Sequence, residues 1–401
     1  MEKHSYYKEG AWWTSPFNEK EEVKKTFPNH TVEIHDATLR DGEQTPGVVF
    51  TADQKFDIAS KLYEAGIRRI EAGMPAVSAD DASAAKRIAN EFKDAEVYAF
   101  VRAMATDIDL AAETGAKGVI IEVPIGYPKL KYQFNWTWEK VFEKSASCIN
   151  YAKQCGLKAV YFPYDATRAN EDDIENLFSN LMKDARPDAI GLVDTMGCAL
   201  PETIAYMVRW YKSITNGLPI EVHCHNDFGM AVACELAGAS AGAEVLHACV
   251  NGLGERTGNA ALEEIVLALK LLMGMDCRYD IEKLDPLCRM VEQYSGIKCA
   301  HNKPFGGDRN YTRESGIGVN LVMEQPLAMF ATDPRYFNKT ANVVLGKKSG
   351  KLSVSYKLNQ MGMTATDEQI AQILAGVKEL GIKKKGLLSD QEFLSIVKEC
   401  M

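Results

Sequence analysis

The stretch AAETGAKGVIIEV, residues 111–123, contains the pattern that decides the fold: the end of an amphipathic helix, a glycine, and then a hydrophobic strand. The same pattern recurs in LYEAGIRRIEAG (62–73), AKQCGLKAVYF (152–162) and LAGASAGAEVLHACV (236–250). A glycine just beyond the last helical turn readily takes the left-handed conformation that ends a helix. We therefore expect a helix to end and a strand to follow at four glycines: Gly66, Gly115, Gly156 and Gly242.

Hydrophobic segments alternate with helical patterns over most of the chain. The predicted strands lie near residues 32–37, 68–72, 96–101, 118–123, 158–162, 189–193, 219–224 and 245–250. Strands that alternate with helices at this spacing form parallel βαβ units, and eight such units close into a (β/α)8 TIM barrel of the α/β class. A doubly wound open sheet is the alternative. It is disfavoured because no GxGxxG motif opens the first βα turn.

The regular alternation ends near residue 275, and the segment that follows is irregular and rich in glycine and polar residues. Residues 365–400 have the pattern of two short helices, each with a Thr or Ser N-cap. We therefore predict an N-terminal arm (1–28), a TIM-barrel catalytic domain (29–275) and a mainly helical C-terminal subdomain (276–401). The sequence leaves open whether the aromatic start of the arm packs on its own chain or reaches a partner.

Composition narrows the class of protein. The chain has 401 residues, a net charge of −9 and no basic block longer than the KKK at 383–385, so a nucleic-acid partner is not expected. No apolar run is long enough to span a membrane, and no signal peptide is evident, so no membrane partner is expected either. The ten cysteines are scattered without a CxxC pair. We expect reduced thiols and a cytoplasmic location.

Active sites of TIM barrels lie at the carboxyl ends of the strands, so polar residues at those ends are the candidates for chemistry. They are Arg40, Asp41 and Gln44 after the first strand, Asp194 and Thr195 after the sixth, His223 and His225 at the end of the seventh, and Asn259 after the eighth. These four groups are expected to converge on one rim of the barrel.

His223 and His225 are two residues apart on a strand, so both imidazoles point to the same face, which is the barrel interior. Together with Asp41 they form a 2-His-1-carboxylate set suited to a divalent metal that keeps open positions for substrate. Mg²⁺, Mn²⁺ and Zn²⁺ all fit these ligand types, and Asn259 lies at the same rim. The alternative is a hydrogen-bonded histidine pair without a metal. Cys224 points to the other face and is not counted as a ligand.

Arg40 stays charged at all physiological pH values and offers planar donors. Beside a metal it would stabilise an enolate or alkoxide oxygen as negative charge develops there. The alternative is a salt bridge to Asp41 or Asp36 that only orders the loop.

At these residues the chain resembles the synthase branch of the DRE-TIM metallolyase family, which contains 2-isopropylmalate, homocitrate and citramalate synthases. The motifs that carry the resemblance are LRDGEQTPGV (39–48), EAGMPAVSADD (71–81), VHCHNDFGMAVA (222–233), NGLGERTGNAALEEI (251–265) and VLGKKSG (344–350). They occur in the family's order and at the expected strands, which makes the combined signal specific.

The resemblance implies a metal-dependent, Claisen-type condensation of acetyl-CoA, or another acyl-CoA, with a 2-oxoacid to give a 2-hydroxy-2-alkyl di- or tricarboxylate. It also implies a homodimer. By the resemblance, four residues would hold the metal, with Asn259 binding through its side-chain oxygen: Asp41, His223, His225 and Asn259. Five residues would line the substrate pocket, with Arg102 and Thr195 near carboxylate groups: Arg40, Gln44, Glu71, Arg102 and Thr195.

The departures from the family lie at its acid/base positions. Tyr164 stands where synthases carry a glutamate, Arg313 and Gly318 replace two histidines, and Lys348 replaces a third. Tyr164 is expected to donate a proton, and Arg313 and Lys348 to bind an additional anionic group. The acceptor is then expected to differ from 2-oxoisovalerate. The alternative is that these positions drifted in an enzyme whose base lies elsewhere.

Two further functions remain open at this stage. A retro-aldol or retro-Claisen lyase on the same metal is disfavoured, because hydroxymethylglutaryl-CoA lyases carry a catalytic cysteine in the loop after strand eight, where this chain has GLGERTGN (252–259). A non-catalytic homologue is disfavoured because Arg40 and the metal ligands are intact. We expect no regulatory domain after the C-terminal helices, and therefore no leucine feedback site.

Overall fold

The computed structural model describes residues 5–401, which form two compact units. The first, which we call the barrel unit, spans Asn18–Cys299, and the second, the terminal unit, combines the chain before Asn18 with Ala300–Met401. The domain boundaries expected after residues 28 and 275 do not coincide with this division and stay predictions. Residues 1–4 of the expected arm lie outside the described residues.

A closed parallel barrel forms the barrel unit, in the strand order β10-β3-β4-β5-β6-β7-β8-β9. Its strands are β3 Glu33–Asp36, β4 Arg69–Glu71, β5 Glu96–Arg102, β6 Gly118–Pro124, β7 Lys158–Tyr164, β8 Ala189–Asp194, β9 Ile220–Cys224 and β10 Val245–Ala248. Each of the eight predicted strands is present, and the first and last pair in register to close the sheet. The predicted TIM barrel is confirmed, and the open sheet is excluded.

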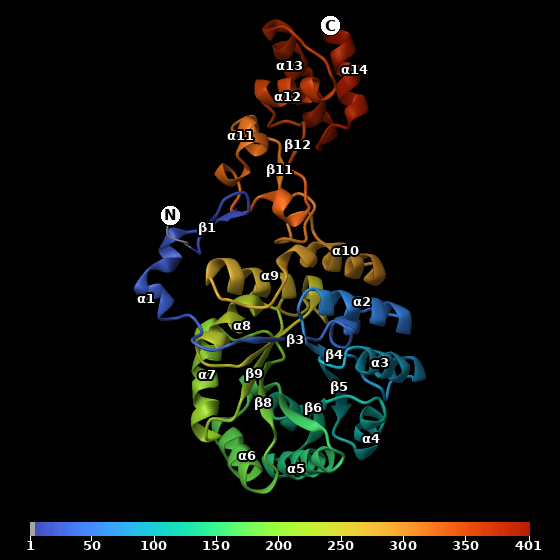
Figure 1. Cartoon of the computed structure of the whole chain (residues 1–401), viewed down its shortest axis with the longest axis vertical. Coiled ribbons are helices and arrows are strands. Elements are labelled where there is room, and N and C mark those ends of the chain that lie inside the picture. Colours follow the sequence, from blue (N-terminus) through green and yellow to red (C-terminus); the bar gives the residue numbers. More distant parts are fainter. Residues whose placement is uncertain (1–4) are drawn as a thin grey trace. The chain divides into compact units, whose positions relative to one another are not determined.

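Helices connect the strands and surround the barrel (Figure 1). They are α2 Ala52–Glu64, α3 Ala79–Glu91, α4 Ala105–Glu113, α5 Trp138–Gln154, α6 Glu171–Asp184, α7 Pro201–Ile214, α8 Ala231–Ser240 and α9 Leu262–Leu267. A short helix, α1 Glu21–Lys24, precedes the barrel, and α10 Leu284–Ser295 follows it and packs beside α2. Among residues 5–401 no helix is long and apolar enough to cross a membrane.

The glycines of the repeated pattern end their helices as predicted. Gly66 and Gly115 have φ values of +90° and +81°, a conformation that residues with a Cβ adopt at a cost. At the other end of α2, Thr51 and Gln54 form a capping box, in which each side chain accepts the other's backbone N–H. Local sequence therefore fixes both ends of a helix, and packing against the barrel supplies the rest of its stability.

The barrel interior is filled by an apolar cluster to which several strands contribute. It contains Tyr98, Phe100, Ile120, Val160, Phe162, Ala189 and Val193, with Met74 packed against it. Full burial of one large apolar side chain contributes about 1.5–3 kcal/mol. This cluster closes the inside of the barrel below the polar residues at the carboxyl ends of the strands.

The terminal unit is built from both ends of the described chain. Its helices are α11 Val319–Glu324, α12 Lys351–Gln360, α13 Asp367–Lys384 and α14 Asp390–Cys400. It also contains two short strand pairs, β1 Tyr7–Lys8 with β2 Trp12–Trp13 and β11 Thr312–Arg313 with β12 Asn342–Val343. The two helices predicted in 365–400 are α13 and α14, and the helical character of this region is confirmed.

The N-terminal hairpin packs on the C-terminal part of its own chain. The backbone N–H of Trp13 donates to the carbonyl of Ala331 at 2.8 Å, and that of Asp333 donates to Ala11 at 2.7 Å. The rings of Trp12 and Tyr336 meet edge to face, with centroids 5.7 Å apart. The described part of the arm therefore packs on its own chain, and its expected role in a partner interface stays a prediction.

Two glycine substitutions test whether a close backbone neighbour adds to the cost of placing a side chain in the left-handed conformation. A Cβ at Gly115 meets nothing within 4 Å, so Gly115→Ala is expected to cost only about 1–2 kcal/mol of conformational strain. A Cβ at Gly66 would lie 2.6 Å from the carbonyl oxygen of Arg278, so Gly66→Ala is expected to cost clearly more. Urea unfolding followed by circular dichroism measures both, and equal losses would contradict the contact argument.

Candidate active site

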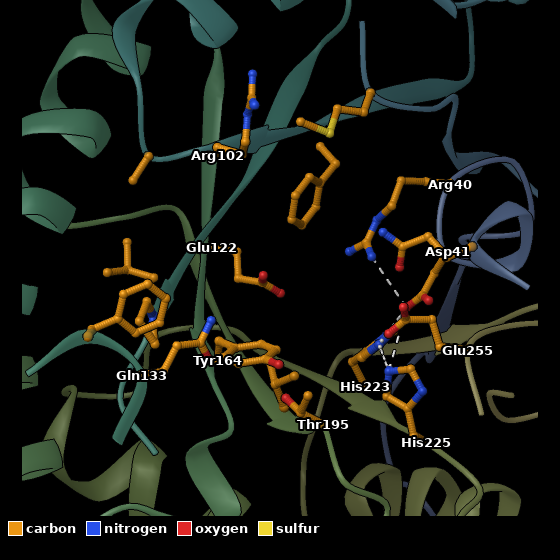
Figure 2. Close-up of a pocket in the computed structure, with 18 of the residues that line it drawn as sticks. Arg40, Asp41, Arg102, Glu122, Gln133, Tyr164, Thr195, His223, His225 and Glu255 are labelled. Carbon is orange, nitrogen blue, oxygen red and sulfur yellow. Dashed lines mark hydrogen bonds and ion pairs between the residues drawn. The ribbon is translucent and has the colours of Figure 1, made fainter. Parts of the chain in front are cut away.

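A cavity of about 620 Å³ lies at the carboxyl ends of the barrel strands (Figure 2). Most of the residues expected in the site line it: Arg40, Asp41, Gln44, Arg102, Tyr164, Thr195, His223 and His225. They come from strand ends or the loops that follow, from β3 round to β9. The barrel therefore brings together side chains that lie up to 185 positions apart in the sequence (40 to 225).

Asp41, His223 and His225 form a tight group at one side of the cavity. The Nε2 atoms of the two histidines are 3.4 Å apart, and Asp41 Oδ2 lies 3.1 Å from His223 Nε2 and 3.7 Å from His225 Nε2. Neighbouring ligands on a metal with bonds of about 2.1 Å are roughly 3.0–3.5 Å apart. The spacing of these three atoms thus suits a common divalent ion.

Unpartnered buried oxygens point to the same conclusion. Asp41 Oδ1 and Asn259 Oδ1 are buried without a hydrogen-bond partner, although the amide nitrogen of Asn259 donates to the carbonyl of Leu253 at 2.9 Å. A buried oxygen without a partner loses about 1–3 kcal/mol of stabilisation unless something satisfies it. A cation would satisfy both, so these residues fit a metal ion as the sequence analysis expected.

The protonation states of Asp41 and His225 also favour the binding of a metal ion. Burial by itself would raise the pKa of Asp41, but the charge of Arg40 and the hydrogen bond from His223 outweigh it and hold that pKa well below its usual range. Burial lowers the pKa of His225 to about 4, against the attraction of Asp41. A charged carboxylate and a neutral imidazole are the forms that bind metals.

Arg40 is held on three sides. Its Nε donates to Glu71 Oε1 at 2.8 Å, its guanidinium lies 4.0 Å above the ring of Phe100, and its Nη1 is 3.4 Å from Asp41 Oδ2. The salt bridge to Asp36 that the sequence left open does not form. Although the pairing with Asp41 and Glu71 orders the loop, the guanidinium still faces the cavity (Figure 2).

Glu71 occupies a different place from the one expected. It is buried, is not among the residues that line the cavity, and bonds to Arg40 on one oxygen and to His35 Nε2 on the other at 3.3 Å. The charge of Arg40 overcomes the effect of burial and lowers the pKa of Glu71 to about 2. Glu71 thus supports Arg40 from behind.

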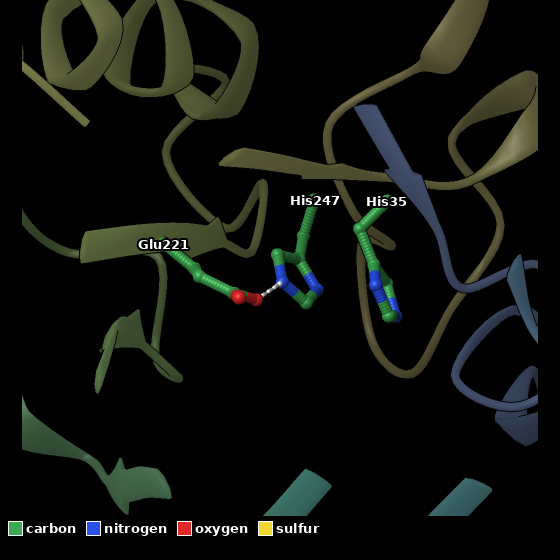
Figure 3. Close-up of side chains that lie close together, drawn as sticks. All are labelled: His35, Glu221 and His247. Atoms are coloured by element: carbon green, nitrogen blue, oxygen red, sulfur yellow. Dashed lines mark hydrogen bonds and ion pairs between the residues drawn. The ribbon is translucent and has the colours of Figure 1, made fainter. Parts of the chain in front are cut away.

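A second group of buried ligand-type residues lies in the barrel, formed by His35, Glu221 and His247 (Figure 3). Here the carboxylate and both imidazole Nε2 atoms already have partners, although Nδ1 of His35 and of His247 is buried without one. Glu221 accepts from Arg69 at 2.6 Å and pairs with His247 Nε2 at 2.8 Å, and the rings of His35 and His247 stack with centroids 4.2 Å apart. With the cation of Arg69 on its carboxylate, this group is a hydrogen-bonded network of the core.

Three further expected residues differ in whether their polar side-chain atoms already have partners. Thr195 Oγ1 accepts the backbone N–H of Asp165 at 2.8 Å, which leaves its own proton for an acceptor in the cavity. Tyr164 is the last residue of β7 and lines the cavity. Arg102 also lines it, but its guanidinium is bound to Asp107 in a two-point ion pair at 2.8 and 3.0 Å.

The changed subdomain residues Arg313, Gly318 and Lys348 belong to the terminal unit. Arg313 donates from Nε to the carbonyl of Ile317 at 3.2 Å, and Lys348 lies 3.5 Å from Glu314. The expected binding of substrate by Arg313 stays a prediction.

Sequence reasoning missed Glu122, which lies on β6 and lines the cavity. Burial raises its pKa to about 7, although the charge of Arg40 opposes this. The signal was present in the sequence: Glu122 interrupts a hydrophobic strand, GVIIEVP, whose neighbours are buried. A charged residue on a strand that is otherwise buried usually has a specific structural or functional role.

Comparison with known proteins places the chain in a family. The family model described as HMGL-like matches residues 31–291, well over half of the chain. The chain belongs to the HMGL-like family. A second model, described as homocitrate synthase post-HMGL domain-like, matches residues 306–385 in the terminal unit. These two matches, with the relatives below, confirm the resemblance to the synthase branch of the DRE-TIM metallolyases.

Among its relatives, homocitrate synthase AksA of Methanocaldococcus jannaschii is 40% identical over 98% of this chain and 95% of that protein. The (R)-citramalate synthase CimA of the same organism is 39% identical over 92% of this chain and 74% of that protein. The HMG-CoA lyase of Bacillus subtilis has a similar structure, with a TM-score of 0.59 and 20% identity over 67% of this chain and 95% of that chain. This last likeness shows the barrel fold alone.

Removal of single ligands should weaken metal binding. Asp41→Asn and His223→Ala are each expected to lower the affinity for Mn²⁺ by more than about tenfold, because the first removes the negative charge of a ligand and the second removes an imidazole ligand. Isothermal titration calorimetry measures this directly. His301→Ala is the control, because His301 is exposed and pairs only with Asp308. Unchanged affinity in the two site variants would refute the assignment.

Proposed function

We propose that this protein is a divalent-metal-dependent synthase that condenses acetyl-CoA, or another acyl-CoA, with a 2-oxoacid to give a 2-hydroxy-2-alkyl di- or tricarboxylate. The observation that carries the proposal is the group Asp41, His223 and His225 beside Arg40 in the barrel cavity. The near full-length similarity to proteins named homocitrate and citramalate synthases supports it.

The metal ion would be held by Asp41, His223, His225 and the side-chain oxygen of Asn259, and Mg²⁺, Mn²⁺ and Zn²⁺ suit these ligands. When bound, such an ion supplies a Lewis acid and a template for the keto and carboxylate oxygens of a 2-oxoacid. The cavity of about 620 Å³ has room for a small oxoacid and the thioester end of an acyl-CoA.

Arg40 is the electrostatic stabiliser of this proposal. Its position is fixed by Glu71 and Phe100 before substrate arrives, so its donors need little reorganisation when negative charge develops on an oxygen in the cavity. Thr195 is suited to donate its hydroxyl proton to the substrate carboxylate, and Gln44 offers an amide at the cavity wall. Tyr164 and Arg102 complete the cavity as candidate substrate contacts.

We also propose an assembly state, a location and a class of substrates. We expect a homodimer in the cytoplasm, with small-molecule substrates and neither nucleic acid nor membrane as partner. Arg313 and Lys348 carry positive charge in the terminal unit and suit an additional anionic group of the substrates. An acceptor different from 2-oxoisovalerate follows from these changes.

A thiol-release assay tests the function. Purified protein with Mn²⁺ or Mg²⁺, acetyl-CoA and each of a panel of 2-oxoacids is expected to release CoA thiol with at least one acceptor, and mass spectrometry should find the condensed 2-hydroxy acid. Thiol release without an oxoacid would indicate mere thioester hydrolysis. Absence of turnover with every acceptor and both metals would refute the synthase.

Arg40→Lys tests the electrostatic role. Lysine keeps the charge but loses the planar fork that contacts Glu71 and the cavity at once, so kcat is expected to fall about 10²–10³-fold. The matched control is Arg87→Lys, because Arg87 forms an exposed pair with Asp53 and stacks on Phe56. Steady-state kinetics with the preferred acceptor would contradict the role if Arg40→Lys retained wild-type kcat.

A further inference from the structure

Glu122 points into the barrel. Ile120, two residues earlier on β6, belongs to the apolar cluster of the barrel interior, and side chains alternate along a strand, so Glu122 faces the same interior. Figure 2 shows its carboxyl group directed into the open middle of the cavity, with the Asp41–His223–His225 group on one side.

The carboxylate of Glu122 is uncommitted. Among residues 5–401 no donor forms a hydrogen bond or ion pair with it. The other carboxylates at the site are paired or exposed. Asp41 belongs to the group with His223 and His225, Glu71 pairs with Arg40, and Glu255 lies largely exposed beside Arg256. Glu122 is therefore the carboxylate that the cavity offers for chemistry.

Glu122 and Tyr164 lie on neighbouring strands of the barrel. Strands β6 and β7 are paired in parallel, with Glu122 opposite Phe162 and Pro124 opposite Tyr164. Glu122 and Tyr164 thus enter the same cavity from neighbouring strands. Tyr164 stands where the synthases of the resemblance carry a glutamate. The carboxylate that is missing at the end of β7 is present one strand away.

We propose that Glu122 is the general base of the condensation, a role that rests on the proposed function. Its carboxylate takes a proton from the methyl group of acetyl-CoA, and the resulting enolate carbon bonds to the keto carbon of the 2-oxoacid. The keto oxygen receives the carbonyl electron pair, and the Glu122 carboxyl returns the proton to it. Water then replaces CoA at the thioester and releases the thiol, so atoms and charge balance.

The environment suits a base that works near neutrality. Burial raises the pKa of Glu122 to about 7, and the charge of Arg40 limits the rise. The titratable and charged groups around it come from the strand ends on every side: Arg40, Asp41, Glu71, Arg102, Tyr164 and His223. A carboxylate in this setting is ionised in part at pH 7 and more basic than an exposed glutamate.

Glu122→Gln tests the proposal, because glutamine keeps the shape but cannot accept the proton. With acetyl-CoA, Mn²⁺ and the preferred 2-oxoacid, kcat is expected to fall about 10²–10⁴-fold, while KM for the oxoacid and Mn²⁺ affinity by calorimetry stay within about threefold. In the wild type, kcat/KM should rise with pH through a limb near neutrality, which Glu122→Gln should lose. Tyr164→Phe is measured beside it as the rival proton carrier, and the matched control is Glu91→Gln, an exposed residue at the end of α3 that should keep wild-type kcat.

The outcomes separate the alternatives. A kcat of Glu122→Gln within tenfold of wild type overturns the role, as does a loss of activity that is matched by a loss of Mn²⁺ binding. A large loss in Tyr164→Phe with little in Glu122→Gln assigns the proton transfer to Tyr164 instead. If the wild type itself turns over no 2-oxoacid while it binds Mn²⁺, the proposed function fails, and the role of Glu122 fails with it.

Discussion

The buried ion pair between Arg40 and Glu71 is the interaction on which the site depends. Both side chains are almost fully buried, at 8% and 1% exposure, and they follow or end adjacent strands, β3 and β4. An unpaired charge at such a depth costs several kcal/mol, and loss of one partner of a buried pair typically costs about 3–5 kcal/mol. The pair fixes the guanidinium over Phe100 and brings it to Asp41, so the loop that carries Asp41 is ordered by the same contact.

The barrel contains two groups of the same residue types, and the partners of their atoms separate them. In the group of Asp41, His223 and His225, Asp41 Oδ1 remains unpartnered and the two histidine Nε2 atoms converge. In the network of His35, Glu221 and His247, the carboxylate is already bound to Arg69 and to an imidazole. Burial, with the nearby His35, lowers the pKa of His247 to about 3, so a neutral ring fits the core. Residue type alone marks both groups as possible metal sites, and the hydrogen-bond partners of their carboxylates favour the first.

Much of the fold and part of the site could be predicted from local sequence. Glycines such as Gly66 mark where helices end, and the two-residue spacing of His223 and His225 fixes a common face, because both depend only on backbone geometry. The support of Arg40 by Glu71 could not be predicted, because it depends on the register between strands. Glu122 was missed for a related reason: whether an interior glutamate meets a cation, a metal or an empty cavity depends on side chains from other strands.

The self-packed N-terminal hairpin has a consequence for how the chain comes to be folded. Its backbone partners, Ala331 and Asp333, are synthesised more than 300 positions after Trp13, and the entire barrel lies between them. At a translation rate of about 5–20 residues per second, the aromatic segment waits on the order of 15–60 s for the surface that covers it. During that time Trp12 lacks the ring of Tyr336, against which it packs in the folded unit. Strands β1 and β2 are therefore made long before the segment that pairs with them, and the terminal unit cannot be complete until residues 331–336 have been synthesised.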